Sequence, residues 1–372
     1  MGGHERFGAY EVHECLGFGG MASVHRATIA IGAGVIREVA LKRLLPQLAD
    51  DKTFVDDFVR EAKLAAQLHH PGIVRILELG RSGSTYFIAM ELVPGQPLLK
   101  LLRAAYTARV TTPIGVVVAI LSELLDALDY ASTACDADGD ALEIVHRDLS
   151  PSNLIVTDEG HVKIIDFGVA KSLTGKFMTN TGAIKGKLSY MAVEALTGSA
   201  IDRRADIFSI GVVAWELITG RRLFQGANEL AVITKLRAGA SELPSTYSAA
   251  CPPELDEIVM HALSLDREHR WPSAAVMKRA LDTLRRTYRD GAREVAAWKH
   301  GLLPPAPLFE ELVTVDLSTR DLIAEPSGRG LMPFQIERAS LTDVDAHAPE
   351  PELATEITHD TMITTPPRRD EC

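Results

Sequence analysis

Two short motifs in the middle of the chain carry the residue types that chemistry on a phosphate requires. Residues 146–153 read HRDLSPSN, and after 12 further residues 166–168 read DFG. Asp148 could hold an acceptor hydroxyl in line, while Asn153 and Asp166 offer the hard oxygen ligands that Mg²⁺ prefers. Two unrelated turns would seldom carry both motifs in this order and spacing. The pair therefore predicts phosphoryl transfer.

A glycine-rich segment near the start of the chain could bring backbone N–H groups close to phosphates. Residues 16–24 read LGFGGMASV, which fits G-x-G-x-x-G-x-V with Ala22 in place of the third glycine. Taken alone, a glycine-rich hairpin turn is the competing interpretation. A dinucleotide-binding fold would need a helix directly after the loop, but a second strand is expected here, which favours a flap over a nucleotide. The predicted nucleotide contacts in this segment are Leu16, Gly17, Phe18, Gly19, Gly20 and Val24.

A lysine at the end of an apolar strand is the next candidate. Lys42 closes the run VALK, 25 residues after Gly17. Its ammonium needs a partner there, and Glu61 in the following helix is the natural one. This pairing would leave Lys42 to contact the α- and β-phosphates. A solvated lysine and a solvated glutamate are the alternative when each is taken alone.

The elements that must position these residues change in character along the chain. The first hundred residues contain short β-rich runs and one amphipathic helix over 51–68. The runs are Tyr10–Gly17, Ala22–Ala30, Arg37–Arg43, Ile73–Gly80 and Thr85–Leu92. Helices dominate from Pro113 onward, apart from a short strand pair. The strand pair is Leu154–Val156 and Val162–Ile165, and the later helices are expected at 203–219, 228–238, 253–264 and 272–299. The pattern predicts an α+β fold with a small β-rich lobe and a larger helical lobe.

Charge and cysteine usage exclude several classes of protein. The net charge is -11, and residues 301–372 hold 14 Asp/Glu against 5 Arg, which leaves about -2 for residues 1–300. A nearly neutral folded part argues against a nucleic-acid partner, and the acidic, Thr/Pro-rich end is expected to be disordered. The 4 cysteines form no CxxC pair, and the N-terminus has no apolar signal core. The longest apolar runs carry acidic residues. We therefore expect a cytoplasmic protein without a membrane span.

Over about residues 8–290 the chain resembles the bacterial eukaryotic-like (Hanks-type) serine/threonine protein kinases. The motifs quoted above carry the resemblance, together with the Gly-Gly-Met-Ala form of the flap and residues 90–93, which read MELV. The resemblance implies a bilobal protein-kinase fold that binds ATP with Mg²⁺, for which Mn²⁺ could substitute. It implies an extension at 1–7, an N-lobe at 8–91, a hinge at 91–95 and a C-lobe at 96–290, followed by a helical extension and tail over 291–372. It also implies adenine-side contacts from Ala40, Met90, Glu91 and Val93.

Further positions match the family and bear on the architecture of the site. Asp206 fits the residue that supports the catalytic loop, and Arg270 fits the arginine that pairs with Glu194 at the end of the activation segment. His146 and Phe167 would stack on each other. A small-molecule phosphotransferase on this scaffold is disfavoured, because the long activation segment and the Glu194–Arg270 pair build a platform for protein substrates.

Two departures from the family pattern concern groups that would touch each other. Ser150 stands where the family has a lysine that contacts the γ-phosphate, and Lys187 stands where it has a threonine. We hypothesise that Lys187 reaches toward Asp148 and the γ-phosphate and takes over the missing role. The alternative is a solvated Lys187 in a slow enzyme, or a pseudokinase that acts as a nucleotide-binding interaction module. A third departure is Val193 in place of the proline of Ala-Pro-Glu.

Regulation and substrate preference complete the expectations. Arg147 would receive a phosphate on Thr179 or Thr181, placed there by autophosphorylation in trans by a second copy of the chain. Ordinary solvated loop threonines are the alternative. Pro151 favours serine or threonine over tyrosine in the protein substrate. Gln96 and Ser152 replace the acidic residues that often select basic substrates, so no preference for arginine upstream of the acceptor is expected.

Overall fold

The structure is a computed structural model, and it describes residues 5–303 apart from 33, 137 and 168–186. The chain divides into two compact units, Met1–Glu337 and Arg338–Cys372, and every described residue belongs to the first. The tail that was expected to be disordered and the threonines Thr179 and Thr181 lie outside the described residues. None of the helices in the described ranges combines the length and apolarity that a membrane crossing needs.

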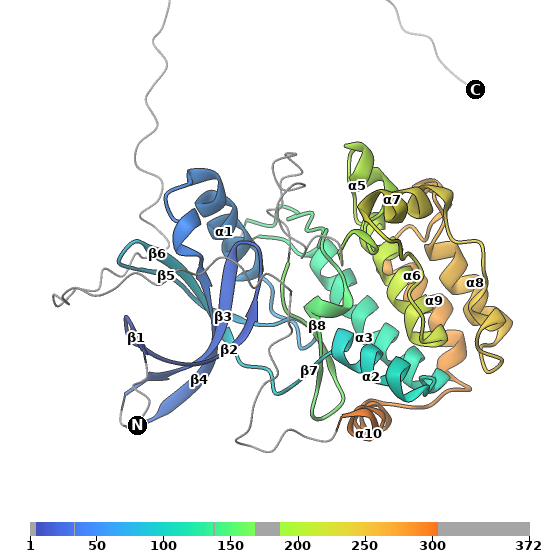
Figure 1. Cartoon of the computed structure of the whole chain (residues 1–372), viewed down its shortest axis with the longest axis horizontal. Coiled ribbons are helices and arrows are strands. Elements are labelled where there is room, and N and C mark those ends of the chain that lie inside the picture. Colours follow the sequence, from blue (N-terminus) through green and yellow to red (C-terminus); the bar gives the residue numbers. More distant parts are fainter. Residues whose placement is uncertain (1–4, 33, 137, 168–186, 304–372) are drawn as a thin grey trace, which may run out of the picture. The chain divides into compact units, whose positions relative to one another are not determined.

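A six-stranded antiparallel sheet forms the small lobe, with the strand order β1-β2-β3-β4-β6-β5 (Figure 1). The register pairs Val24 of β3 with Lys42 of β4, and Lys42 with Ile88 of β6. The glycine-rich turn and the lysine thus lie on adjacent strands. The strands are β1 (Glu5–Phe7), β2 (Tyr10–Phe18), β3 (Ala22–Ala30), β4 (Ile36–Leu44), β5 (Ile76–Ser82) and β6 (Thr85–Glu91).

Helix α1 (Lys52–Ala65) covers one face of this sheet. The Asp51 side chain caps its first turn by accepting a hydrogen bond of 2.9 Å from the backbone N–H of Thr53. Phe58 and Ala62 are buried against the sheet, at 0% and 1% exposed. Glu61 follows Phe58 by three positions, so it shares the inner face of the helix. The amphipathic pattern therefore directs a carboxylate into the interior.

The large lobe is helical and is built around two buried helices, α3 (Ile114–Thr133) and α6 (Arg204–Thr219). A small antiparallel sheet, β7-β8-β9, lies between this lobe and the small lobe. Three 3₁₀ turns, η2 (Pro151–Asn153), η3 (Pro244–Thr246) and η4 (Arg267–His269), lie in this lobe, and η1 (Pro46–Leu48) lies in the small one. The remaining elements are β7 (Gly95–Pro97), α2 (Leu98–Ala108), β8 (Leu154–Thr157), β9 (Val162–Ile164), α5 (Val193–Thr197), α7 (Glu229–Ala238), α8 (Pro253–Ala262), α9 (Ala274–Arg285) and α10 (Ala292–Leu302).

Backbone hydrogen bonds join the segment after α1 to the strand that precedes the DFG motif. The N–H of Ile164 donates to the carbonyl of Gly72, and the N–H of Val74 donates to the carbonyl of Ile164, both at 2.9 Å. This short parallel bridge ties β9 to the small lobe. This backbone bridge holds Asp166 near α1 independently of any side-chain contact.

One helix prediction was wrong. The sequence indicated a single helix over 272–299, but the chain leaves α9 at Arg285 and begins α10 at Ala292. Gly291 caps the new helix, and its N–H donates to the Glu294 carboxylate at 2.9 Å. The break lets α10 fold back onto α2, α3 and β8, where buried Lys299 pairs with Asp158.

The predicted α+β, two-lobed fold class is confirmed, and the predicted strands match the observed ones to within a few residues. The sequence reasoning did not identify α2. It also did not identify β1, which adds Glu5–Phe7 to the edge of the sheet.

Candidate active site

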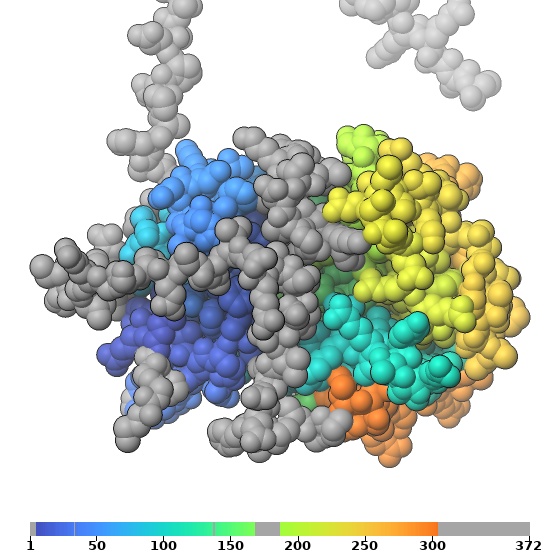
Figure 2. All heavy atoms as spheres, viewed as in Figure 1, coloured from blue at the N-terminus to red at the C-terminus, as the bar shows by residue number. Residues whose placement is uncertain are grey.

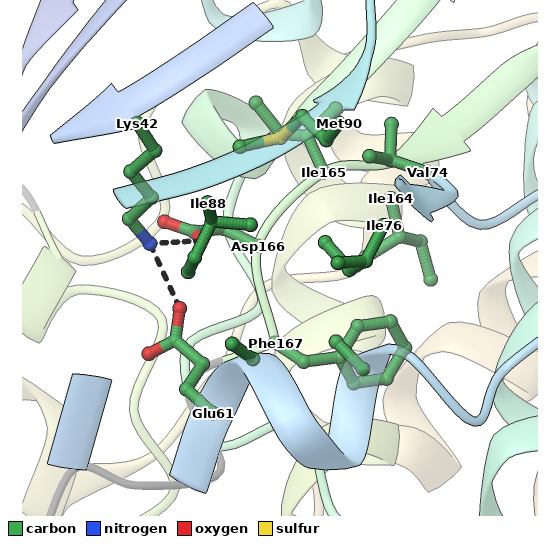
Figure 3. A pocket seen from close by; sticks show the side chains of 12 residues that line it. Lys42, Glu61, Val74, Ile76, Ile88, Met90, Ile164, Ile165, Asp166 and Phe167 are labelled. Atoms are coloured by element: carbon green, nitrogen blue, oxygen red, sulfur yellow. Dashed lines mark hydrogen bonds and ion pairs between the residues drawn. The ribbon is translucent and has the colours of Figure 1, made fainter. Parts of the chain in front are cut away.

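The ammonium of Lys42 lies between two carboxylates that come from different parts of the chain. Its Nζ is 2.8 Å from Glu61 Oε1 on α1 and 2.5 Å from Asp166 Oδ1 beyond β9. Figure 3 shows both carboxylates in contact with the ammonium of Lys42, which belongs to β4. Lys42 and Glu61 are almost fully buried, while the Asp166 side chain is 36% exposed. The ion pairs therefore connect the sheet, the helix and the DFG segment at one point.

The charges in this cluster shift one another's pKa values. Burial would lower the pKa of Lys42, but Asp166 and Glu61 outweigh it and raise that pKa well above its usual range. Burial would likewise raise the pKa of Asp166, yet the Lys42 ammonium holds it well below its usual range. Burial raises the pKa of Glu61 to about 7 despite its contact with Lys42. Lys42 and Asp166 are therefore both charged near neutral pH.

An apolar cavity lies behind the Lys42 ion pairs. Met90 of β6 and Phe167 of the DFG motif both line it, and Figure 3 shows their side chains on opposite sides of the space. The remaining lining residues are Lys42, Glu61, Ala62, Ala65, Val74, Ile76, Ile88, Ile164, Ile165 and Asp166. Apolar walls exclude water from one side of the ion pairs and so strengthen them.

Asp206, at the start of α6, fixes the backbone of the catalytic loop. Its two carboxylate oxygens accept hydrogen bonds from the N–H groups of His146 (2.7 Å) and Arg147 (3.0 Å). Arg147 has a φ of 63°, an unusual conformation for a residue with a side chain. The two bonds to Asp206 support that conformation, and burial raises the pKa of Asp206 to about 6. The His146 ring packs on Phe167, with ring centroids 4.8 Å apart.

Asp148 is buried and contacts two other predicted site residues. The side-chain amide of Asn153 donates to the backbone carbonyl of Asp148 at 2.8 Å and to its Oδ2 at 3.0 Å. The Lys187 ammonium lies 2.6 Å from the same Oδ2. Because the Asn153 nitrogen faces Asp148, the amide oxygen is directed away from it. That oxygen and the ionised Asp166 carboxylate form the kind of hard-oxygen donor set that fits Mg²⁺.

Lys187 extends from the end of the activation segment, where its carbonyl accepts the N–H of Tyr190 at 3.0 Å. Its side chain is 34% exposed, so it is only partly buried. Ser150 is buried, and its hydroxyl lies 2.8 Å from that of Ser152. In the structure, Lys187 and not residue 150 therefore provides the cation that touches Asp148.

The glycine-rich segment forms a tight turn between β2 and β3. The N–H of Gly19 donates to the carbonyl of Ala22 at 2.8 Å, and the Phe18 side chain is 61% exposed. Leu16, Gly17 and Phe18 end β2, and Gly20 precedes β3, which contains Val24. Ala40 is buried in β4, and Met90 and Glu91 end β6 before Val93. These residues therefore lie on the turn and strands that the sequence predicted, and their contacts with a nucleotide stay a prediction.

Of the predicted regulatory residues, only Arg147 lies in the described part of the chain, where it is exposed. Glu194 and Arg270 form a bidentate ion pair, with N–O distances of 2.6 and 2.9 Å. This pair anchors the end of the activation segment to the large lobe.

Sequence reasoning missed two contacts beside the site. Lys163 of β9 donates to the Glu91 carboxylate at 2.6 Å, which links the end of β6 to the strand that precedes the DFG motif. The Tyr190 hydroxyl donates to Glu216 Oε2 inside α6 at 2.7 Å. Glu216 was visible as a carboxylate in an apolar helical run. Its partner Tyr190 lies 26 residues away in the sequence, and no local sequence pattern predicts the contact.

The buried carboxyl of Glu216 makes the stability of the fold near this site depend on pH. The residue is 2% exposed, and burial raises its pKa to about 7 from 4.5. Because the folded pKa is the higher one, the folded state holds this proton more tightly than the unfolded chain. The resulting stabilisation is complete below about pH 4.5 and is lost as the pH rises through 7.

We therefore expect the Tm of the wild type to fall by about 5 °C between about pH 5 and pH 8. The Glu216→Gln variant keeps an acceptor for the Tyr190 hydroxyl and should show a shallower fall in differential scanning fluorimetry. Glu254→Gln, at an exposed position of α8, is the matched control. Equal slopes in wild type and Glu216→Gln would contradict this account.

Comparison with known sequences places this geometry in a family. The protein kinase domain family matches residues 10–281. Tyrosine-protein kinase MasK of Myxococcus xanthus is 39% identical over 286 residues, which cover 77% of this chain and 44% of MasK. Serine/threonine-protein kinase PrkC of Bacillus subtilis is 32% identical over 278 residues, covering 74% of this chain and 40% of PrkC. The chain thus spans less than half the length of these curated relatives.

A solved structure supports the same assignment. The kinase domain of PknI from Mycobacterium tuberculosis superposes with a TM-score of 0.57 and 26% sequence identity, over 76% of this chain and 99% of that one. Protein kinases generally use ATP and Mg²⁺, and the relatives include bacterial serine/threonine kinases of the Hanks type. From its matched domain, its two-lobed fold and the residues gathered at its site, we conclude that the chain belongs to the protein kinase family.

Proposed function

We propose that the chain is an active kinase that transfers the γ-phosphoryl group of Mg-ATP to hydroxyl groups of protein substrates. The observation that carries the proposal is the simultaneous pairing of Lys42 with Glu61 and Asp166, next to a catalytic loop in which Asn153 and Lys187 contact Asp148. A degenerate pseudokinase would not be under pressure to keep all of these groups in contact. The pseudokinase alternative is therefore disfavoured.

Each residue has a distinct role in the proposed reaction. Lys42 would hold the α- and β-phosphates, while Glu61 fixes the lysine. Asn153 and Asp166 would hold Mg²⁺ (Mn²⁺ could substitute), which when bound neutralises charge on the phosphates. Asp148 would orient the acceptor hydroxyl and accept its proton. The turn at 16–24 would cover the phosphates with backbone N–H groups, and Ala40, Met90, Glu91 and Val93 would surround the adenine.

Lys187 takes a catalytic role in this proposal. The ammonium contacts Asp148 and belongs to a side chain that is only partly buried, so it would lie beside a phosphoryl group that is transferred at Asp148. Preorganised donors at such groups commonly contribute about 3–4 kcal/mol. Ser150 is buried and its hydroxyl is neutral, so it supplies no such charge. In this proposal, Lys187 of the activation segment supplies the positive charge that a lysine of the catalytic loop supplies in the family.

The acceptor hydroxyl is proposed to belong to serine or threonine. Pro151 and the similarity to PrkC favour this acceptor. The relative MasK is named a tyrosine-protein kinase, so phosphotyrosine is the outcome that would overturn the assignment. Thr179 and Thr181 are proposed as sites of autophosphorylation by a second copy, with Arg147 as the receiving group. The free cysteines of the described residues fit a reducing, cytoplasmic setting.

The direct test uses γ-labelled ATP with Mg²⁺ and the purified chain. We expect labelled phosphoserine or phosphothreonine in the wild type. The Asp148→Asn variant should lose at least about 100-fold of the rate, because the hydroxyl is no longer oriented by a carboxylate. Phosphoamino-acid analysis identifies the acceptor. Equal labelling of wild type and variant would show that the reaction does not use this site.

Replacing Lys187 by alanine tests the relocated cation. We expect kcat to fall by about 100-fold or more, with little change in the KM for ATP, because the lost contact acts on the transferring group. Lys235→Ala, at an exposed position of α7, serves as the matched control and should leave kcat unchanged. A Lys187→Ala enzyme within about threefold of the wild type would disprove the role.

A further inference from the structure

Two basic residues lie on helix α2, next to the catalytic loop. This helix packs against η2 (Pro151–Asn153), the turn that follows Asp148. Arg103 is exposed on α2, and Lys100 precedes it by three positions, so the two side chains are neighbours on the helix surface. On the face drawn in Figure 2, α2 (teal) and the yellow region that follows α6 are both at the surface.

A second arginine approaches the same place from the end of α6. The guanidinium carbon of Arg222 lies 5.8 Å from the centroid of the Tyr190 ring. Tyr190 in turn is held by the carbonyl of Lys187, the residue that contacts Asp148. Burial and Glu216 raise the pKa of Tyr190, and the positive charges of Arg222 and Arg103 both oppose that rise. The positive charges of both arginines therefore act on the Tyr190 hydroxyl.

Within the described ranges, these two arginines differ from nearby arginines in forming no ion pair with a carboxylate. Arg204 pairs with Asp202 and Glu268, and Arg270 pairs with Glu194. No carboxylate in the described ranges forms an ion pair with Arg103 or Arg222. Glu216 interacts electrostatically with Arg222, but it is 2% exposed, and its pKa of about 7 leaves it only partly charged near neutral pH. The surface beside Asp148 is thus positive and uncompensated.

We propose that this surface binds acidic side chains of the substrate, so that the kinase prefers acceptors preceded by aspartate or glutamate. The inference rests on the proposed function and specifies its substrate class. The neutral residues Gln96 and Ser152 are consistent with this preference, because neither position offers a carboxylate that would attract a basic side chain. Arg103 and Arg222 are the residues that determine this specificity.

The expected size of the preference follows from the exposure of the site. Ion pairs at partly exposed positions are individually weak, so two arginines together support roughly a tenfold preference. Because such pairs are screened, the preference should shrink as the salt concentration rises toward about 1 M, where the Debye length is about 3 Å. A preference that is independent of salt would contradict an electrostatic origin.

The experiment compares three threonine peptides that differ only in the residues before the acceptor, which are glutamate, glutamine or lysine. We expect kcat/KM to fall in that order, with about a tenfold ratio between the glutamate and glutamine peptides. In the double variant Arg103→Gln/Arg222→Gln this ratio should fall to within about twofold of unity. Arg237→Gln/Arg279→Gln removes the same charge from exposed positions of α7 and α9 and should keep the ratio.

A binding measurement separates this inference from the proposed activity. Fluorescence anisotropy of the labelled glutamate peptide needs no phosphoryl transfer, and it should show weaker binding to the arginine double variant than to the control variant. If no peptide is phosphorylated but binding keeps this pattern, the proposed activity fails and the acidic-binding surface stands. Equal binding by both variants, or tighter binding of the lysine peptide, would overturn the inference.

Discussion

Taking a charge out of water costs several kcal/mol unless a partner compensates for it, and the active site is built under that constraint. The Lys42 ammonium is buried, and it is stable there because Glu61 and Asp166 both contact it. Those carboxylates come from α1 and from the segment after β9. Satisfying one buried cation therefore fixes the sheet, the helix and the DFG strand relative to one another. The backbone bridge between Ile73 and Ile164 reinforces the same connection.

The same constraint explains the catalytic loop and its departure from the family pattern. Asp206 is ionisable and buried, and two backbone N–H groups of the loop stabilise its charged form. Asp148 is buried as well, and with serine at position 150 the loop offers it no lysine. Lys187 supplies the cation from the activation segment at 2.6 Å. A cation beside Asp148 can come from the catalytic loop or from the activation segment, provided that its side chain is long enough to reach the carboxylate.

The sequence predicted the parts of the fold that depend on local patterns. Short β-rich runs bounded by turns located the strands, and apolar residues at helical spacing over 51–68 located α1. The helix over 272–299 was wrong because helical periodicity continues across the break, which is set by the Gly291 cap and by docking of α10. The contacts Lys163–Glu91 and Tyr190–Glu216 could not be found, since each joins residues distant in sequence. Motif spacing and the family resemblance predicted the contacts Lys42–Glu61 and Lys187–Asp148, which the structure contains, whereas the contact between Lys42 and Asp166 appeared only in the tertiary structure.

The account's central claim is that catalysis requires one cation beside Asp148 and that Lys187 supplies it. A reciprocal exchange tests this most directly, with steady-state kcat measured for Lys187→Thr and for Ser150→Lys/Lys187→Thr. The account predicts that the single variant is slowed by about 100-fold and that the double variant recovers most of the loss, because the cation returns from the catalytic loop. A single variant with wild-type kcat would contradict the claim. So would a double variant that binds nucleotide normally and recovers no activity.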